Sequence, residues 1–371
     1  MEPSACQERI GTTYFSRSSV NLVRRSFGAA FFWIALVPCY AKAQQSTVIK
    51  LNAYLDQAHQ AGVFNGNILV TDHGKVILRR ALGYADGSRT VPLNLSDRFD
   101  IGSIAKEFDA VGLLMLAEQG KLSLTDRLSK FFPDLPSWAA TVTINDLLHY
   151  TSGLPEVDWN TVKSDADNWK NLYALKQLDF PDGTHYAYNN NNTFLRRRVI
   201  EKVSGMSFEE FLEKREFPKA GIRDAVIDPT EATPRVPKAF DVHDKQDPIT
   251  VDMTGWTSLG LGDFLRWSNC ITDFCLITPS STRQIVTTRD SEWQTGLGHG
   301  DMVGDRLVRH VHDGSNHDYQ ALLMTAPSKG RTIIILTNQK RNNVYAMGDA
   351  INAILDDKQI GRASCRERVW R

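Results

Sequence analysis

The sequence has little that would indicate a metal site or a nucleic-acid partner. It contains five cysteines in 371 residues and no His-Glu-x-x-His pattern. Lysine and arginine together number 43, and aspartate and glutamate also number 43. Because no excess of positive charge is present, the composition does not favour binding to nucleic acid or to an anionic membrane surface. We therefore expect no metal, no other cofactor and no nucleic-acid partner.

Long hydrophobic segments are also missing. The apolar stretch Phe27–Val37 is too short to span a bilayer with ease. Arg24 and Arg25 precede this stretch, and Ala41-Lys42-Ala43 follows it with the small-x-small pattern of a cleavage site. We therefore expect residues 1–43 to be a signal peptide that is cleaved after Ala43, and the mature protein to be secreted or periplasmic.

The two ends of the chain carry further signals. Cys39 follows Pro38, where a lipoprotein signal has a small residue, so no stable membrane anchor is expected. Residues 1–19 form a long polar prelude, which leaves open a start at Val20 instead of Met1. Residues 360–371 begin with a segment that resembles a translated sequencing adapter, so we expect this tail to be non-native.

Residues 44–359 remain as the body, a single domain in our interpretation. The body holds 34 basic and 40 acidic residues, and only two of the cysteines, Cys270 and Cys275. In an oxidising compartment these two could form a small local disulfide. Two ordinary buried thiols are an equally good interpretation of the sequence.

Strand patterns occur at both ends of the body, with helical patterns between them. The region 156–235 in particular is expected to be mostly helical. An antiparallel sheet formed by both chain ends, flanked by helices and carrying this helical insertion, is an α+β fold. The expected strands are 67–71, 75–82, 304–312, 318–326 and 332–338, and helices are expected at 48–60, 142–150, 192–205, 207–214 and 344–355.

The segment Arg98–Gly120 is the first with a chemical signature. From Ile104 onward it is apolar around most of a helix, as in a buried helix. Ser103 and Lys106 lie three residues apart on one face, so a hydroxyl and an amine can share a proton. Such a Ser-x-x-Lys pair is weak evidence alone, because Ser103 could merely cap the helix.

Two further motifs follow in the chain. Tyr188-Asn189-Asn190 lies ahead of a helix, and His312-Asp313-Gly314 lies on a predicted strand. Taken singly, Tyr188 could be a packed aromatic and His312 a surface strand residue. Their order behind Ser103 and Lys106 favours a catalytic interpretation.

At this point the chain resembles the serine β-lactamase-like hydrolases, the group of class C β-lactamases, D-peptidases and related esterases. The resemblance covers roughly residues 48–355. It extends beyond the three motifs to the stretches FDIGSIAK, LTDRLSKFFPDLP, INDLLHYTSGLP, GTHYAYNNNNTFL, GLGDFLRWSNCI and IIILTN.

The resemblance implies a role for each motif. Ser103 would attack a carbonyl and form an acyl-enzyme, and Lys106 and Tyr188 would be a coupled pair that takes its proton. Asn190 would contact a substrate amide or orient the lysine. The backbone N–H groups of Ser103 and Ser315 would form an oxyanion hole.

The third motif departs from the Lys-Thr-Gly of class C β-lactamases. Gly314 would let the strand approach the substrate closely. His312, mostly neutral at pH 7, would bind a substrate carboxylate less well than lysine does. Tyr150 also stands where many relatives have histidine, a change that we expect to affect the fold more than the chemistry.

The resulting prediction is a serine hydrolase that acts on esters or small D-amino-acid amides. A low-activity β-lactamase or peptidoglycan D,D-peptidase is the first alternative. A non-catalytic penicillin-recognising module is the second, although such a module would not need the Lys106 and Tyr188 pair. The partner in each case is a small molecule, and the sequence leaves the oligomeric state open.

Overall fold

A computed structural model describes residues 30–250 and 252–358. The chain divides into two compact units, residues 1–46 and 47–371. Helix α1 (Ala30–Gln60) runs across this boundary. The expected signal peptide falls largely outside the described residues, as does the expected non-native tail. In the part of the chain that the structure describes, no helix is both long and apolar enough to cross a membrane.

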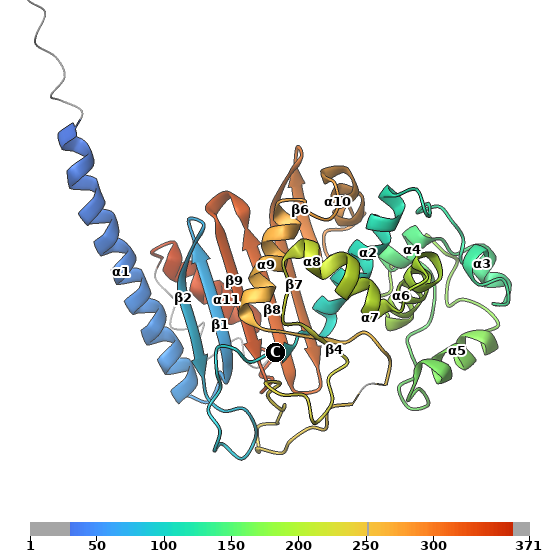
Figure 1. Cartoon of the computed structure of the whole chain (residues 1–371), viewed down its shortest axis with the longest axis horizontal. Helices are drawn as coiled ribbons and strands as arrows, with labels where there is room; N and C mark the ends of the chain where they lie inside the picture. The colour runs from blue at the N-terminus through green and yellow to red at the C-terminus, as the bar shows by residue number, and fades with distance from the viewer. Residues whose placement is uncertain (1–29, 251, 359–371) are drawn as a thin grey trace, which may run out of the picture. The chain divides into compact units, whose positions relative to one another are not determined.

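The second unit contains a six-stranded antiparallel sheet built from both ends of the chain (Figure 1). The strand order is β2-β1-β9-β8-β7-β6. This confirms the predicted α+β class. The strands are β1 (Gly66–Asp72), β2 (Lys75–Leu82), β6 (His299–Val303), β7 (Arg306–Asn316), β8 (Tyr319–Ala326) and β9 (Arg331–Thr337).

Each face of this sheet is covered by helices. One apolar cluster joins Leu51 and Leu55 of α1 to Ile68 of β1, Ile335 of β9 and Ile351 of α11 (Val344–Leu355). The other cluster contains side chains of the alternate strand positions and packs them against α2 (Lys106–Glu118) and α9 (Leu261–Thr272). Figure 1 shows α9 in front of the sheet and α11 behind it. Because side chains alternate between the two faces of each strand, the sheet separates two apolar cores.

The predicted helical insertion is present between residues 156 and 235. It contains α5 (Asp165–Ala174), α6 (Asn190–Ser204), α7 (Phe208–Phe211), a π-helical turn at Leu212–Glu216 and α8 (Phe217–Ala220). It also contributes β4 (Val226–Ile227) to a small second sheet with β3 (Phe99–Asp100) and β5 (Thr257–Leu259). The remaining helices are α3 (Leu128–Phe131), α4 (Ile144–His149) and α10 (Pro279–Val286).

Local signals in the sequence explain several element boundaries. Thr143 caps α4, where its hydroxyl accepts from the backbone N–H of Asp146 and the Asp146 carboxylate accepts from the Thr143 N–H. Ser207 and Glu210 form the same reciprocal box at α7, as their spacing predicts. The helix predicted at 207–214 is however interrupted by the π-helical turn, which the capping pattern could not reveal.

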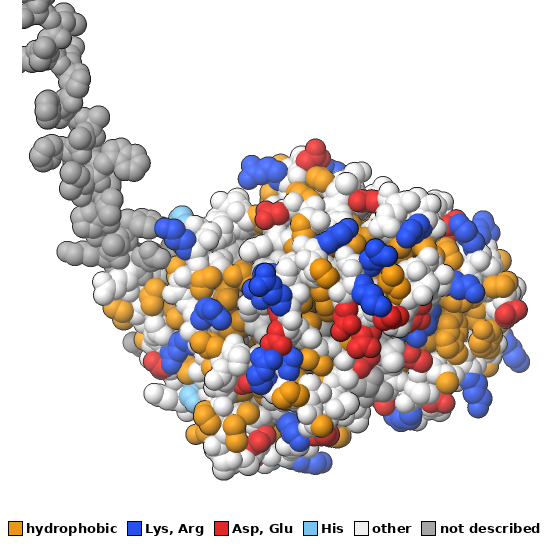
Figure 2. Space-filling model, in the orientation of Figure 1, with side chains coloured by type: hydrophobic (Ala, Val, Ile, Leu, Met, Phe, Trp, Pro, Cys, Tyr) orange, Lys and Arg blue, Asp and Glu red, His pale blue; other side chains and the backbone are white. Residues whose placement is uncertain are grey.

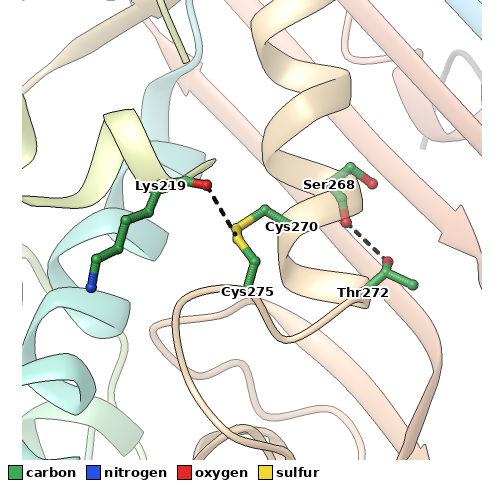
Figure 3. Close-up of a disulfide and its surroundings, with 5 residues drawn as sticks. All are labelled: Lys219, Ser268, Cys270, Thr272 and Cys275. Carbon is green, nitrogen blue, oxygen red and sulfur yellow. Dashed lines mark hydrogen bonds between the residues drawn. A yellow bond between two sulfur atoms is a disulfide. The ribbon is translucent and has the colours of Figure 1, made fainter. Parts of the chain in front are cut away.

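Cys270 and Cys275 form a disulfide at the end of α9 (Figure 3). The sequence left this pairing open, and the structure settles it. The Cys275 sulfur lies 3.8 Å from the carbonyl oxygen of Lys219, beside α8. The disulfide thus closes a short loop next to α8.

Candidate active site

Ser103 lies in a tight turn that the surrounding backbone holds in place. The turn is a 3-10 helix, Gly102–Ala105, that leads directly into α2 at Lys106. The sequence predicted a helix that starts at Ser103, so the α-helical part begins three residues later. Gly102 has a φ of 54°, in the left-handed region that suits glycine, and its N–H donates to Asp100 Oδ1 over 2.7 Å.

Both predicted partners of Ser103 reach its hydroxyl. Lys106 Nζ lies 2.8 Å from Ser103 Oγ, and Tyr188 OH lies 2.8 Å from the same oxygen. Tyr188 precedes α6, so the insertion supplies one partner and α2 supplies the other. The structure therefore brings together the three residues that the motifs single out.

The surroundings of Lys106 change its acidity. The side chain is buried, and burial lowers the pKa of Lys106 to about 8 because the ammonium loses its hydration. Its Nζ lies 5.2 Å from the centre of the Tyr188 ring and 5.3 Å from that of Trp256. Burial also raises the pKa of Tyr188 to about 12. At neutral pH a lysine of this pKa can lose its proton far more readily than an exposed one.

A buried ion cluster lies behind the pair. Asp109, one turn after Lys106 on α2, accepts from Arg196 Nε over 2.5 Å and from Arg197 Nε over 3.3 Å. Arg196 also lies over the Tyr150 ring at 5.2 Å, and that ring packs 4.7 Å from the ring of Tyr188. Tyr150 thus packs against both Tyr188 and Arg196.

The backbone of β7 lies directly against the Ser103 turn. A Cβ added to Gly314 would come within 2.7 Å of the Ser103 nitrogen, and one added to Gly102 would collide with the Ser315 nitrogen. Only glycine at both positions permits this approach. The two amide nitrogens predicted for the oxyanion hole are therefore neighbours across this contact.

A cavity of roughly 380 Å³ opens at Ser103. It contains Asn190, as expected, but the Asn190 amide donates to Glu156 Oε1 over 2.9 Å instead of approaching Lys106. Ser315 lines it as well. The described residues that line it are Ser103, Trp159, Lys163, Asn190, Thr250, Asp252, Trp256, Ser315, Asn316, His317 and Lys340.

His312 does not lie where the sequence analysis expected it. Its side chain is buried, and its Nδ1 lies 2.8 Å from Glu107 Oε1 in the core between β7 and α2. The ring is not among the residues that line the cavity. The expectation that His312 contacts a substrate carboxylate is therefore wrong for this structure, because a buried carboxylate already holds the ring.

Sequence reasoning missed a cation that does line the cavity. Lys340 follows β9, and its Nζ lies 3.3 Å from Ser315 Oγ. Within the described residues, no carboxylate lies within ion-pair distance of this amine, whereas Lys163 pairs with Asp252 at 3.6 Å. The available signal was the order of the last three predicted strands: in an antiparallel meander the first and third strands run in the same direction, so β7 and β9 end at the same edge of the sheet.

Comparison with known sequences shows the family. The sequence matches the profile described as "Beta-lactamase" over residues 50–358. "Penicillin-binding protein 4*" of Bacillus subtilis is 30% identical over 303 residues, which cover 75% of this chain and 63% of that protein. "Putative penicillin-binding protein PbpX" of the same organism is 25% identical over 300 residues, which cover 78% and 74%. The chain thus spans less than two thirds of the length of the first of these relatives.

Solved structures show the same fold at low identity. A class C beta-lactamase superposes with a TM-score of 0.69 at 20% identity, covering 86% of this chain and 97% of that one. A "Beta-Lactamase/D-Alanine Carboxypeptidase" from Pseudomonas syringae gives a TM-score of 0.67 at 19% identity, covering 86% and 100%.

Proposed function

Because the chain belongs to the Beta-lactamase family, we propose that it is a serine hydrolase that forms an acyl-enzyme on Ser103 and acts on esters or small D-amino-acid amides. One observation carries this proposal, the approach of Lys106 Nζ and Tyr188 OH to Ser103 Oγ at 2.8 Å each. A hydroxyl that contacts both a lysine of lowered pKa and a phenol is arranged for proton removal.

The reaction follows from this geometry. Ser103 Oγ attacks the carbonyl carbon of the substrate while its proton passes to the neutral amine of Lys106, directly or through Tyr188. The carbonyl oxygen becomes an oxyanion, which the N–H groups of Ser103 and Ser315 stabilise. The intermediate collapses, the leaving alcohol or amine takes the proton, and the acyl group stays on Ser103. A water molecule then releases the acid by the same steps.

A hydrolysis panel on the purified protein tests this function. We expect turnover of p-nitrophenyl esters or of D-amino-acid anilides, and loss of that turnover in Ser103→Ala. The L-amino-acid anilides serve as the matched stereochemical control. No turnover of any ester, amide or nitrocefin by the wild-type protein would contradict the proposal.

A second candidate, a low-activity β-lactamase or D,D-peptidase, is favoured by Lys340. These substrates carry a carboxylate, and the Lys340 amine lies at the cavity beside Ser315 without an ion-pair partner in the described chain. A charge-assisted contact contributes about 1.5–3 kcal/mol, which corresponds to roughly ten- to hundredfold in kcat/KM.

Lys340→Gln therefore separates the two substrate classes. If carboxylates bind at Lys340, the variant should lose about ten- to hundredfold in kcat/KM on nitrocefin and keep its rate on an uncharged p-nitrophenyl ester. Lys163→Gln is the matched control, because Lys163 lines the same cavity but is paired with Asp252. Equal losses on both substrates would exclude selective binding of a carboxylate by Lys340.

A non-catalytic penicillin-recognising module is the third candidate. Acylation of Ser103 without release of the acyl group would distinguish it from the two enzymes. The Lys106 and Tyr188 contacts argue against a module that only binds, since binding alone does not require a base, whereas acylation of Ser103 does.

We also propose that the protein is secreted or periplasmic, with residues 1–43 removed as a signal peptide. The Cys270–Cys275 disulfide supports this, because disulfides persist in oxidising compartments. N-terminal sequencing of the exported protein should begin at Gln44. Accumulation of the uncleaved chain in the cytoplasm would contradict this proposal.

A further inference from the structure

A second polar cluster lies next to the nucleophile turn, and the proposed reaction does not use it. Glu107, the residue after Lys106, extends from α2 toward β7. Its Oε1 lies 2.8 Å from His310 Nε2 and 2.8 Å from His312 Nδ1. Its Oε2 accepts from Trp267 Nε1 of α9 over 2.6 Å. All four side chains are at most 1% exposed.

A carboxylate lies at the centre of the cluster. An ionised carboxylate only accepts hydrogen bonds, so the two histidine nitrogens that face Glu107 must carry protons and donate to it, as the indole N–H of Trp267 does. Burial alone would raise the pKa of Glu107, but the charge and hydrogen bonds of His310, together with His312, lower it to about 2. Glu107 is therefore ionised over the whole range in which the enzyme would work.

The cluster is connected to the oxyanion hole through β7. Side chains two residues apart on a strand share a face, so His310, His312 and Gly314 all point toward α2. Glu107 forms hydrogen bonds with the side chains at the first two of these positions, His310 and His312. The third, Gly314, lies against the Ser103 nitrogen, and the Ser315 nitrogen lies against Gly102. The contact of β7 with the Ser103 turn and the contact of β7 with Glu107 thus lie next to each other along the same face of the strand.

We propose that Glu107 is a positioning residue, which binds β7 to α2 through His310 and His312 so that the Ser103 and Ser315 N–H groups point at one oxyanion. This inference rests on the proposed function. The two halves of the hole come from different elements, so their separation depends on how closely β7 sits on α2. A displacement of about 1 Å at such a site can cost about a hundredfold in rate.

A purely structural role makes a different prediction. If Glu107 only stabilised the fold, its loss would lower the melting temperature while the folded fraction kept its kinetic constants. A positioning role predicts that kcat falls while KM stays nearly constant, because the oxyanion develops only in the transition state. It also predicts weaker binding of an arylboronic acid, whose tetrahedral adduct with Ser103 places an oxygen in the hole.

Glu107→Gln is the first test. The amide keeps the shape but cannot accept three hydrogen bonds without presenting its own N–H₂ to a donor. We expect kcat to fall by about 10- to 1000-fold, up to the loss of a full oxyanion donor, with a matching loss in boronic acid affinity. Glu216→Gln is the matched control, because Glu216 is also fully buried beside α2 at Gly112 and, among the described residues, makes no hydrogen bond to β7 through its carboxyl group. This control should keep wild-type kinetic constants.

A pair of His312 variants decides the question if Glu107→Gln does not fold. His312→Asn retains an N–H donor at the same distance from the backbone, and His312→Leu fills similar space without one. We expect His312→Asn to retain a kcat at least tenfold above that of His312→Leu. Equal kcat values in the two variants would overturn the proposal, as would wild-type kcat and boronic acid affinity in folded Glu107→Gln.

The wild-type protein separates this inference from the proposed function. If a fluorophosphonate does not label wild-type Ser103, the proposed function fails. If it labels wild-type Ser103, and Glu107→Gln matches wild type in kcat and boronic acid affinity, only the positioning role fails.

Discussion

At the scale of single residues, burial more than sequence distinguishes the two proposed proton acceptors for Ser103. Lys106 and Tyr188 lie at the same distance from Ser103 Oγ, but burial moves their pKa values in opposite senses, to about 8 and about 12. The lysine is thus the group that reaches its neutral form within the ordinary working range. Because the two groups interact, the measured ionisation will belong to the pair.

The first prediction concerns this ionisation. Lys106 must be neutral to accept a proton, and its lowered pKa lies near 8. We expect kcat/KM on an uncharged ester to rise about tenfold per pH unit below pH 7 and to level off above about pH 8. Lys106→Ala should lower kcat by about 10²–10⁴. A flat pH profile between pH 6 and 9, or full activity of the variant, would exclude Lys106 as the base.

The second prediction concerns the contact between Gly314 and the Ser103 turn. A methyl group at Gly314 would lie 2.7 Å from the Ser103 nitrogen, so β7 must move away. Gly314→Ala should lower kcat by about 10²–10³, as for a lost oxyanion donor. Gly262→Ala is the control, since a Cβ there meets Arg266 only at 3.7 Å and lies within helix α9. Wild-type kcat in Gly314→Ala would show that the hole does not depend on this contact.

At the scale of elements, the sequence predicted those with a strong apolar period and missed those without one. The strand at 75–82 and the helix at 344–355 are found with the predicted bounds. Strand β6 was missed because it is an edge strand that pairs only with β7, and its side chains are half-exposed or exposed. Helix α5 was not delimited because its sequence, DADNWKNLYA, is largely polar and buries only Asn168 and Leu172.

The same limit explains the error at His312. The His312-Asp313-Gly314 motif predicted that His312 lies on a strand. Because side chains alternate along a strand, His312 was expected on the same face as Gly314. What fills the space opposite that face depends on Glu107, which is about two hundred residues earlier in the chain. Spacing within a motif carries no information on such a distant partner. Ser103 and Lys106 were easier to place together, because one helical turn connects them.

The third prediction concerns the π-helical turn that ends at Glu216. Both carboxylate oxygens of Glu216 are buried without a hydrogen-bond partner in the described chain, and burial raises the pKa of this group well above 4.5. In the unfolded chain the group ionises near its ordinary pKa. The folded state therefore holds a proton that the unfolded state loses, and stability falls as pH rises from about 4.5 toward the raised value.

Glu216→Gln should remove this dependence. We expect its melting temperature to match wild type near pH 4 and to exceed it by at least about 2 °C at pH 8, the shift that about 1 kcal/mol produces in a chain of this size. Differential scanning calorimetry across this range measures the difference. A constant difference at every pH would mean that Glu216 does not titrate in this way.

At the scale of the whole molecule, the candidate site lies where the sheet meets the helical insertion. Ser103 and Lys106 come from α2 and the turn before it, Tyr188 from the insertion, and Gly314 and Ser315 from strand β7 in the C-terminal part of the sheet. On the face shown in Figure 2, basic and acidic side chains both occur across the surface, and neither sign covers it alone. This agrees with a small-molecule substrate that is bound in a cavity and not on a charged surface.

The central claim is that Ser103 is the covalent nucleophile of a serine hydrolase. Intact-mass analysis after exposure to a fluorophosphonate tests it most directly, with peptide mapping of the adduct. We predict one adduct per chain, on the peptide that contains Ser103, and none in Ser103→Ala. Labelling that persists in Ser103→Ala, or a wild-type protein that remains unlabelled, would contradict the account.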